Sequence, residues 1–478
     1  MKILERIQKI LFSKENKILF AIVIMEKNNT AFSKTYLKGE VSYGAWDIFS
    51  KGVGVLNSFL VLSALTIYEY GSFQLLLASY SGLAVFMGIG GGVISNDIVR
   101  FEAEGRSGDA KKLFFEISFW KIIIGIVLTV SVFFCAPFLA FKYGAGHISL
   151  IQIMSLLFLH DAFLGVAKTL LELRKKFNLL AGRTSISRVA QFFILFGFYL
   201  FGHINLQAVV ISLVTSMFIT LGFLVFPFIE SYITWKKVEM SSGGFLWKIM
   251  ASYGKWGIFQ QVAGKITPFF ETWAIKLIIS TEAVAIYSVA QTIVGTISGF
   301  LPTKTLSVLV PMEIKNEEKL RKIYTYGMKY LFIMSVCFGV LAFFGVPVLV
   351  SLFFNKYLVS LPYFKVLLLT LPILSIVSIS TVFLTAFRRQ KFGFFNKILR
   401  TSVAIPLYLI LLPIFGLWGL VIHNFIIVSV MLVSTYIYMS GMTPRLFVSI
   451  RDIFSFGSED RIFIGGFIND IKRYLRNK

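Results

Sequence analysis

Long apolar stretches of 18 to 25 residues recur along the whole chain. A helix needs about 20 such residues to cross the hydrocarbon layer of a membrane, where it satisfies its own backbone hydrogen bonds. The 478 residues are 56% hydrophobic, which is more apolar surface than a soluble fold of this length covers. The sequence therefore predicts an all-α polytopic membrane protein with about 12 transmembrane helices. The expected spans cover residues 42–66, 72–95, 116–138, 148–172, 184–203, 206–228, 251–279, 282–310, 326–351, 361–387, 396–415 and 417–441.

One short sequence occurs twice, each time at the start of a span. Ser-Tyr-Gly-Ala-Trp-Asp-Ile-Phe at residues 42–49 recurs as Ser-Tyr-Gly-Lys-Trp-Gly-Ile-Phe at residues 252–259. The spans thus divide into six plus six, and an even number per half gives both halves the same orientation. Parallel repeats of this kind are typical of transporters with a site between the halves. We expect a basic cytoplasmic segment (1–41), an N-lobe (42–240), a C-lobe (241–441) and a basic cytoplasmic tail (442–478), with a central cavity between the lobes.

Basic residues are concentrated on one side of the predicted membrane. With the N-terminus inside, the inner segments hold 33 of the 47 Lys and Arg residues, the outer loops hold only Lys142 and Lys356, and the other 12 lie within the spans. This asymmetry predicts that both termini are cytoplasmic, and the basic excess suits an anionic inner leaflet. The charges are spread over every inner loop without forming one patch, so nucleic acid is not an expected partner. We expect residues 1–40 and the tail to lie on the membrane surface as amphipathic helices.

The sequence offers no pattern for a metal site or a nucleotide cofactor. Cys135 and Cys337 lie inside apolar spans, and the four histidines have no metal-ligand spacing. The glycine run at residues 88–92 follows a span rather than a strand, and no Gly-Lys-Ser/Thr follows it. We therefore expect no bound metal and no cofactor.

A few ionisable residues lie deep inside the predicted spans. Lys51 and Lys265 occur well inside spans 1 and 7, and Glu271 and Asp161 lie near the middle of theirs. A charge at the bilayer centre costs about 2.5–3.5 kcal/mol, so such side chains normally face a wet cavity or a partner. Lysines nearer to the ends of spans can extend to the interface instead.

The deep lysines belong to polar stripes on two repeat-related helices. Positions three, four or seven residues apart share one helix face. A stripe without lysine would indicate close helix packing, but packing does not require lysine. We expect the two stripes to face each other across the central cavity. They consist of Gly44, Asp47, Lys51, Gly54 and Ser58 in span 1, and of Gly254, Gln261, Lys265, Thr272 and Lys276 in span 7.

The buried carboxylates allow two interpretations. Glu271 is badly spaced for an ion pair within its own helix, so it is either a proton- or sodium-coupling group or a buried neutral acid. Asp161 beside His160 either relays protons or makes a polar contact between helices. Asp47 and Lys51 are four residues apart and can neutralise each other.

Several short motifs resemble those of bacterial polysaccharide exporters. Glu-Tyr-Gly-Ser-Phe at residues 69–73 is similar to the turn between their first two spans, and residues 90–105 with Gly108–Lys112 are similar to the exit from their second span. Residues 285–290 resemble the matching start of span 8. Over about residues 40–440 the chain resembles an O-antigen-type oligosaccharide-lipid flippase of the multidrug/oligosaccharidyl-lipid/polysaccharide exporter superfamily. The N-terminal extension departs from the short one usual in that family.

This resemblance implies a non-enzymatic carrier in the bacterial inner membrane that works by alternating access. Its substrate would be a polyprenyl-diphosphate-linked glycan moved from the inner to the outer leaflet for surface polysaccharide biosynthesis, with glycosyltransferases and a polysaccharide polymerase as partners. A diphosphate needs cations at cavity depth, and a glycan needs hydroxyl and amide partners. The expected substrate-binding residues are Lys51, Lys265, Lys276, Gln261, Asn57, Thr272 and Arg100, and the expected ion-coupling residues are Glu271, Asp47 and Asp161.

Two other functions fit the sequence less well. A cation-coupled multidrug efflux antiporter of the same superfamily requires a net acidic cavity, and here the stripe cations modestly outnumber Asp47 and Glu271. A membrane glycosyltransferase or polymerase is disfavoured by the short outer loops and by the lack of acidic clusters.

Overall fold

The computed structural model describes residues 31–441, with breaks at 89–92, 144–146, 175, 302, 304–309, 311–316 and 388. Within these residues every regular element is helical and no strand occurs, as the apolar spans predict. The predicted termini, residues 1–30 and 442–478, lie outside the described part of the chain.

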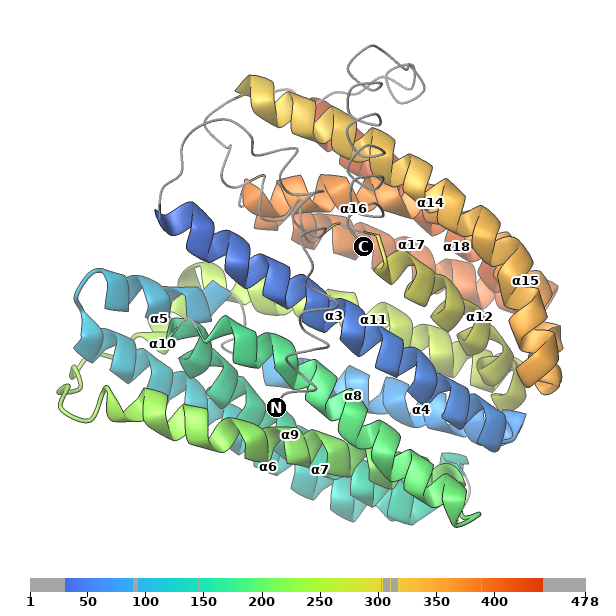
Figure 1. Cartoon of the computed structure of the whole chain (residues 1–478), viewed down its shortest axis with the longest axis horizontal. Coiled ribbons are helices and arrows are strands. Elements are labelled where there is room, and N and C mark those ends of the chain that lie inside the picture. Colours follow the sequence, from blue (N-terminus) through green and yellow to red (C-terminus); the bar gives the residue numbers. More distant parts are fainter. Residues whose placement is uncertain are drawn as a thin grey trace, which may run out of the picture.

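The first half of the chain forms a bundle of long helices. α3 packs against α8, and α6 packs against α7, so that the bundle closes on itself. Figure 1 shows these helices together in the lower half of the molecule. The N-lobe elements are α3 (Ala31–Ala64), α4 (Ile67–Leu83), η1 (Ala84–Gly88), α5 (Val93–Ala103), α6 (Ser107–Tyr143), α7 (Ile148–Leu173), α8 (Phe177–Leu200) and α9 (Leu206–Ile233).

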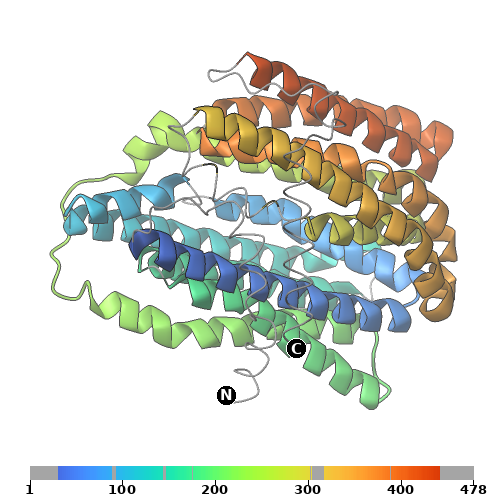
Figure 2. The same cartoon turned by 45° about the horizontal axis from the view of Figure 1, so that its top comes forward.

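The second half forms a similar bundle, in which α11 packs against α17, and α17 against α18. The two bundles lie side by side in both views (Figures 1 and 2). The elements after the N-lobe are α10 (Leu246–Ile249), η3 (Met250–Gly254), α11 (Lys255–Ile278), α12 (Thr281–Gly299), α14 (Glu317–Phe353), η4 (Asn355–Ser360), α15 (Leu361–Leu368), α16 (Leu371–Ala386), α17 (Gln390–Phe415) and α18 (Leu417–Ser440).

Eight of the described helices are long and apolar enough to cross a membrane, which confirms a multi-pass membrane protein. A ninth span arises if residues 355–368 and α16 are counted together, although they meet at a bend of 55°. α8, α11 and α12, which the sequence analysis counts as spans, do not pass the same test. Charged residues such as Lys265 and Glu271 in α11 lower the hydropathy of these helices. The prediction of 12 spans therefore stays a prediction.

Two boundaries differ from the sequence-based expectation. α3 begins at Ala31, so residues 31–41 continue the first span instead of forming a separate surface helix. α4 begins at Ile67, five residues before the predicted second span, because Thr66 caps it. The Thr66 Oγ1 accepts from the Glu69 backbone N–H at 3.2 Å, and a Glu69 carboxylate oxygen accepts from the Thr66 N–H at 2.9 Å. This capping box fixes the helix start.

The molecule has two ends, which we call the gate end and the linker end. The gate end holds residues 64–67, 278–281 and 353–361, and the linker end holds residues 103–107 and 234–250. One buried apolar cluster includes gate-end residues of both lobes, among them Leu65 and Val284. A second cluster, with Phe114 and Trp235, holds the chain between the lobes against the N-lobe at the linker end.

Candidate substrate site between the lobes

α4 is the N-lobe helix that joins the two halves, because it packs against both α11 and α12 of the C-lobe. The approach is tightest at Gly71, where an added Cβ would lie 2.0 Å from the carbonyl oxygen of Thr281. Only glycine leaves room for backbone at this distance. The two lobes are therefore in direct backbone contact near the gate end.

Aromatic side chains close the gate end around this contact. The Phe59 ring of α3 lies 5.4 Å from Phe353 and 4.6 Å from Phe354, between ring centroids. Tyr70 of α4 meets Tyr357 of η4 edge to face at 5.9 Å. Each such pair adds about 0.5–1.5 kcal/mol beyond the area that it buries. The gate end is thus sealed by contacts that would have to break for the lobes to part there.

Lys51 of α3 reaches across to the C-lobe. Its ammonium lies 2.6 Å from the Asp47 carboxylate and donates to the backbone carbonyl of Gly299, in the last turn of α12. Carbonyls at a helix C-terminus carry partial negative charge and attract cations. The Lys51 Nζ also lies 5.8 Å from the centre of the Phe300 ring. Asp47 and Lys51 form the expected ion pair, and the pair stands at the lobe interface.

Arg188 of α8 adds a second cation beside this pair. Its guanidinium donates to the Ser50 carbonyl at 2.6 Å, and it lies so close to Gly54 that an added Cβ would be 2.3 Å from Nη1. The sequence analysis did not select Arg188. Its position inside the predicted span 184–203 was the signal that could have identified it.

Lys265 of α11 makes the matching contact with the N-lobe. Its ammonium donates to the Ser81 hydroxyl of α4 at 3.0 Å, and the Trp273 indole N–H donates to the Ser79 hydroxyl at 3.1 Å. Gln261 lies against Gly88 of η1, where an added Cβ would be 2.4 Å from Oε1. The polar stripe of α11 therefore runs along α4 and η1.

The two deep lysines lie on repeat-related helices, although Lys51 corresponds to Gln261 in the repeat. α3 and α11 each open one half of the chain, and α4 and α12 each follow as the second helix of their half. Lys51 bonds from the first helix of the N-lobe to α12, and Lys265 bonds from the first helix of the C-lobe to α4. Both lysines bridge the lobes through these second helices rather than facing each other directly.

Three other predicted substrate residues lie apart from this interface. Asn57 is buried inside the N-lobe, where its Nδ2 donates to the Arg188 carbonyl at 2.9 Å. Thr272 donates from its hydroxyl to Pro268 of its own helix at 3.0 Å. Lys276 lies in the last turn of α11, at the gate end. The structure does not bring these residues together with Lys51 and Lys265.

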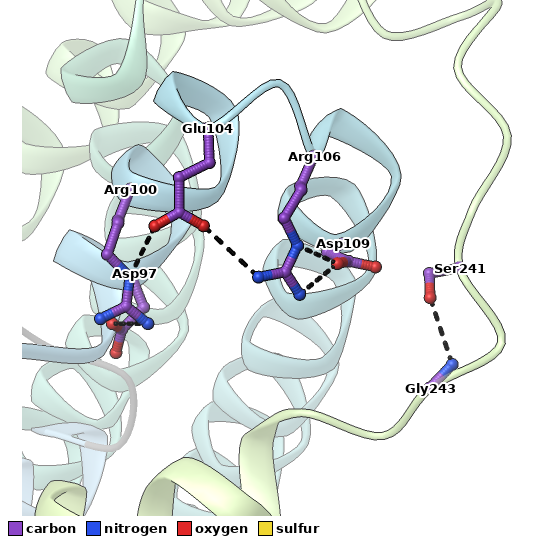
Figure 3. A network of polar contacts seen from close by, with 7 residues as sticks. All are labelled: Asp97, Arg100, Glu104, Arg106, Asp109, Ser241 and Gly243. Atoms are coloured by element: carbon purple, nitrogen blue, oxygen red, sulfur yellow. Dashed lines mark hydrogen bonds and ion pairs between the residues drawn. The ribbon is translucent and has the colours of Figure 1, made fainter.

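Arg100 lies in a separate ionic network at the linker end (Figure 3). Arg100 forms ion pairs with Asp97 at 3.1 Å and with Glu104 at 3.7 Å. Arg106 also pairs with Glu104, at 3.4 Å, and with Asp109, at 2.6 Å. Hydrogen bonding to the Asp109 carboxylate raises the pKa of the Arg106 guanidinium above its ordinary value. This network stabilises the turn between α5 and α6.

Glu271 has hydrogen-bond partners on other helices, and none within its own helix was expected from its spacing. One oxygen accepts from the Gln291 amide of α12 at 2.8 Å, and the other accepts from the Tyr408 hydroxyl of α17 at 2.8 Å. The Tyr408 ring stacks on His423 of α18 with 3.9 Å between centroids. Glu271 thus lies within the C-lobe helices.

Asp161 occupies a comparable place in the N-lobe. It accepts from the Tyr80 hydroxyl of α4, and its other oxygen lies 3.0 Å from the His160 Nδ1. Each lobe therefore holds one carboxylate that a tyrosine from another helix binds. Among the described residues, no three His, Cys, Asp or Glu side chains are grouped as metal ligands.

The two-lobed helical fold is similar to that of solved transporters, among them members of the MOP superfamily. A solved inward-facing MATE multidrug resistance transporter of that superfamily matches with a TM-score of 0.66 and 16% identity, over 90% of this chain and 99% of that one. The lipid II flippase MurJ, in an inward closed conformation, matches with a TM-score of 0.66 and 16% identity, over 91% and 93%. An outward-facing MATE transporter gives a TM-score of 0.58 and 16% identity, over 84% and 96%.

The sequence itself gives a narrower assignment. A family model described as polysaccharide biosynthesis protein matches residues 36–317, which is more than half of the chain. The chain belongs to this polysaccharide biosynthesis family. No functionally curated protein matches it in sequence.

Proposed function

We propose that this protein is a flippase that moves a polyprenyl-diphosphate-linked oligosaccharide from the inner to the outer leaflet of the bacterial inner membrane. It serves surface polysaccharide biosynthesis and works by alternating access of its two lobes. The observation that carries the proposal is the pair of lysines on repeat-related helices, each hydrogen-bonded to the opposite lobe. The family match and the likeness to a lipid II flippase support a lipid-linked substrate.

The interface is suited to a diphosphate. Lys51 and Lys265 donate to neutral oxygens of Gly299 and Ser81, and a diphosphate oxygen is a stronger acceptor than either. Parting of the lobes breaks both bonds, which frees the Lys265 ammonium and exposes the Lys51–Asp47 pair with the Arg188 guanidinium beside it. A hydrogen bond to a charged group contributes about 1.5–3 kcal/mol, so an anionic substrate offsets the loss as the lobes separate. Substrate binding and lobe opening are thereby linked.

The direction follows from the charge asymmetry of the loops. Basic residues assign the linker end to the cytoplasm and the gate end, with Lys356, to the outside. The aromatic contacts of Phe59 and Tyr70 then close the outer side. This conformation precedes entry of the substrate from the inner leaflet. The glycosyltransferases that build the glycan and the polymerase that extends it are the expected partners.

A cation-coupled multidrug antiporter is the second candidate, because each lobe holds a buried carboxylate and the fold is shared with MATE transporters. The interface argues against it. Lys51, Lys265 and Arg188 lie there with the Asp47 carboxylate, and a cationic drug would be repelled. The flippase is therefore the better-supported function.

Reconstitution tests the proposal. Purified protein in liposomes is given a fluorescent undecaprenyl-diphosphate saccharide, and its appearance in the opposite leaflet is followed with an impermeant quencher. The double variant Lys51→Ala/Lys265→Ala should lose at least about tenfold in rate, as expected when 1.4 kcal/mol or more of binding is removed. The matched control is Lys168→Ala/Lys365→Ala, in which both lysines lie near helix ends.

The result that overturns the proposal is a double variant that inserts normally and translocates the saccharide at the wild-type rate. Export of ethidium by the wild type, with no movement of the saccharide, would instead establish the antiporter.

A further inference from the structure

Aromatic side chains are exposed at the linker end, where α10 packs against α6. Trp247 of α10 is 66% exposed, and Phe119 of α6 is 60% exposed. The Trp247 ring meets the Trp120 ring edge to face, with 5.9 Å between centroids. Phe115, one turn before Phe119, meets Tyr232 at the end of α9 in the same way at 6.2 Å. We call these five aromatic residues the linker-end patch.

The patch lies where the exposed apolar side of α6 begins. Phe115, Phe119, Ile126 and Val130 are all exposed and follow each other at helical spacing, so they share one face of α6. This helix is long and apolar enough to cross a membrane, so that face contacts lipid. Phe119 precedes Ile126 by about 10 Å along the helix. Tryptophan is enriched at the boundary between hydrocarbon and head groups, which is the level that the patch occupies.

Free cations border the patch. Lys248 directly follows Trp247, and Lys236 and Lys237 come shortly after the end of α9, and all three lysines are exposed. In the part of the chain that the structure describes, none of their ammonium groups has an ion pair or a hydrogen bond. Residues 234–250 hold these three lysines against the carboxylate of Glu239, so the stretch is net positive.

The turn that carries Trp247 and Lys248 is held in place by α6. The Glu116 carboxylate accepts from the backbone N–H of Leu246 at 2.8 Å. Leu246 and Ile249 are buried, whereas Trp247 and Lys248 between them are exposed. An incoming ligand therefore meets an aromatic ring and an ammonium group whose backbone is already ordered, which lowers the entropy cost of binding.

Aromatic rings at the membrane boundary beside unpaired lysines have the chemistry that recognises an anionic lipid. We propose that the linker-end patch binds an anionic phospholipid, with the phosphate at Lys248 and an acyl chain along Phe119 and Ile126. Lys236 and Lys237 add to the attraction for the head group. This site lies outside the interface between the lobes, and the inference does not rest on the proposed function.

The bound lipid connects the membrane to the helix that joins the two lobes. α10 continues through the π-helical turn η3 into α11, and Lys265 of α11 bonds to Ser81 in the opposite lobe. π-Helical turns are frequent at functional sites of helices. A lipid that holds α10 against α6 restrains the start of α11, so it favours the arrangement of the lobes described above.

Lipid binding by purified protein tests the site. Delipidated full-length protein in detergent is titrated with phosphatidylglycerol and with phosphatidylethanolamine of the same acyl chains, and native mass spectrometry counts the bound lipid. The wild type should bind its first phosphatidylglycerol at least about tenfold more tightly, because that head group has a net negative charge. Lys236→Gln/Lys237→Gln/Lys248→Gln should remove this preference and leave the affinity for phosphatidylethanolamine unchanged.

A second triple variant is the matched control. Lys168→Gln/Lys322→Gln/Lys391→Gln removes the same charge from exposed lysines of α7, α14 and α17. It should keep the wild-type preference for phosphatidylglycerol, because these lysines are outside the patch.

A photolabel locates the lipid without any variant. Phosphatidylglycerol with a diazirine near the start of one acyl chain is photolysed on wild-type protein in nanodiscs, and the labelled peptides are sequenced. Labelling within residues 115–130 or 245–249 should fall with excess phosphatidylglycerol. Excess phosphatidylethanolamine should not reduce it, and neither should glycerol phosphate, which has the phosphate without the chains.

Four outcomes overturn the assignment. Equal affinity of the wild type for the two lipids would show that the patch does not select charge. Equal loss of preference in both triple variants would show that overall charge, and not this surface, attracts the lipid. Labelling confined to other helices would place the lipid elsewhere, and protection by glycerol phosphate would show a site for free phosphate. The flippase proposal stands in each case, since none of these measurements contains its substrate.

Discussion

The Lys356 ammonium of η4 donates to the backbone carbonyls of Ser63 at 2.9 Å and Leu65 at 2.5 Å. The last carbonyls of a helix have no partner within the helix, and α3 has no basic residue in its last turn. A cation from the C-lobe therefore caps the C-terminus of an N-lobe helix. This bond and the aromatic contacts of Phe59 and Tyr70 act together to hold the gate end closed.

Lys356→Met should make opening at the gate end easier. The lost hydrogen bonds are partly exposed, so we expect a shift of about 1 kcal/mol toward the open state, roughly fivefold in population. Electron–electron distances between spin labels at residues 68 and 359, in a background without Cys135 and Cys337, should show a larger long-distance fraction. Lys176→Met is the control, because its exposed pair with Glu230 lies at the linker end. An unchanged distance distribution in Lys356→Met would show that the bond does not contribute to closure.

Gly71→Ala should interfere with the closed state more strongly. The new methyl group would lie 2.0 Å from the Thr281 carbonyl oxygen, and backbone on both sides leaves it no room. Overpacking of this kind costs about 1–3 kcal/mol, so thermal unfolding in detergent should begin at a lower temperature. Gly197→Ala in α8 is the matched control, since its Cβ meets nothing within 4 Å. Equal unfolding temperatures for Gly71→Ala and wild type would mean that α4 and α12 are not held this close.

Most of the fold was predictable because lipid allows few solutions. Apolar stretches, the repeat at residues 42 and 252, and the helical stripes together indicated two helical lobes with Lys51 and Lys265 at their interface. The number of membrane-spanning helices was harder to predict than their existence. Helices that line an interface carry polar residues, and their hydropathy is therefore low. α8, α11 and α12 do not pass the test for a membrane span, and two of them carry interface cations, Arg188 in α8 and Lys265 in α11.

The contacts of the site were harder to predict. Lys51 bonds to the backbone of Gly299, and a backbone carbonyl has no sequence signature. Glu271 is bound by Tyr408, which is 137 residues away and belongs to a different helix. Arg100 and Asn57 were placed in the site because of their polarity, and tertiary packing directs them to other partners. Sequence periodicity identifies the face of a helix, whereas the partner of each side chain is decided by how the helices pack.

Ion coupling, if it drives transport, should depend on Glu271 more than on Asp161. Glu271 belongs to α11, which contacts the opposite lobe directly through Lys265. Asp161 is connected to the interface helix α4 through the Tyr80 hydroxyl, and its own helix α7 packs mainly against α6 and α9. Glu271→Gln cannot change charge, so stimulation of transport by an imposed proton or sodium gradient should fall at least tenfold. Asp161→Asn should keep most of it. The measurement is the initial rate in liposomes with and without the gradient, and full stimulation of Glu271→Gln would contradict the assignment.

The chain between the lobes is fixed to the N-lobe by side chains of α6. The Glu116 carboxylate accepts from the backbone N–H groups of Phe245 at 3.1 Å and Leu246 at 2.8 Å. Lys111 donates to the carbonyls of Trp235 at 2.9 Å and Val238 at 2.8 Å. These bonds hold the linker before η3, and Figure 3 shows part of it, at Ser241 and Gly243, beside α6.

Glu116→Ala should therefore release the linker without unfolding the lobes. Two backbone N–H groups lose a charged acceptor, which costs about 1.5–3 kcal/mol in hydrogen bonding. Limited proteolysis should then cut between residues 236 and 248 several times faster than in wild type, because Lys236, Lys237 and Lys248 are trypsin sites in this stretch. Glu230→Ala is the control, since its exposed pair with Lys176 contributes about 0–1 kcal/mol. Equal cleavage rates in Glu116→Ala and Glu230→Ala would show that the linker is held by its apolar contacts with Phe114 and Trp120 instead.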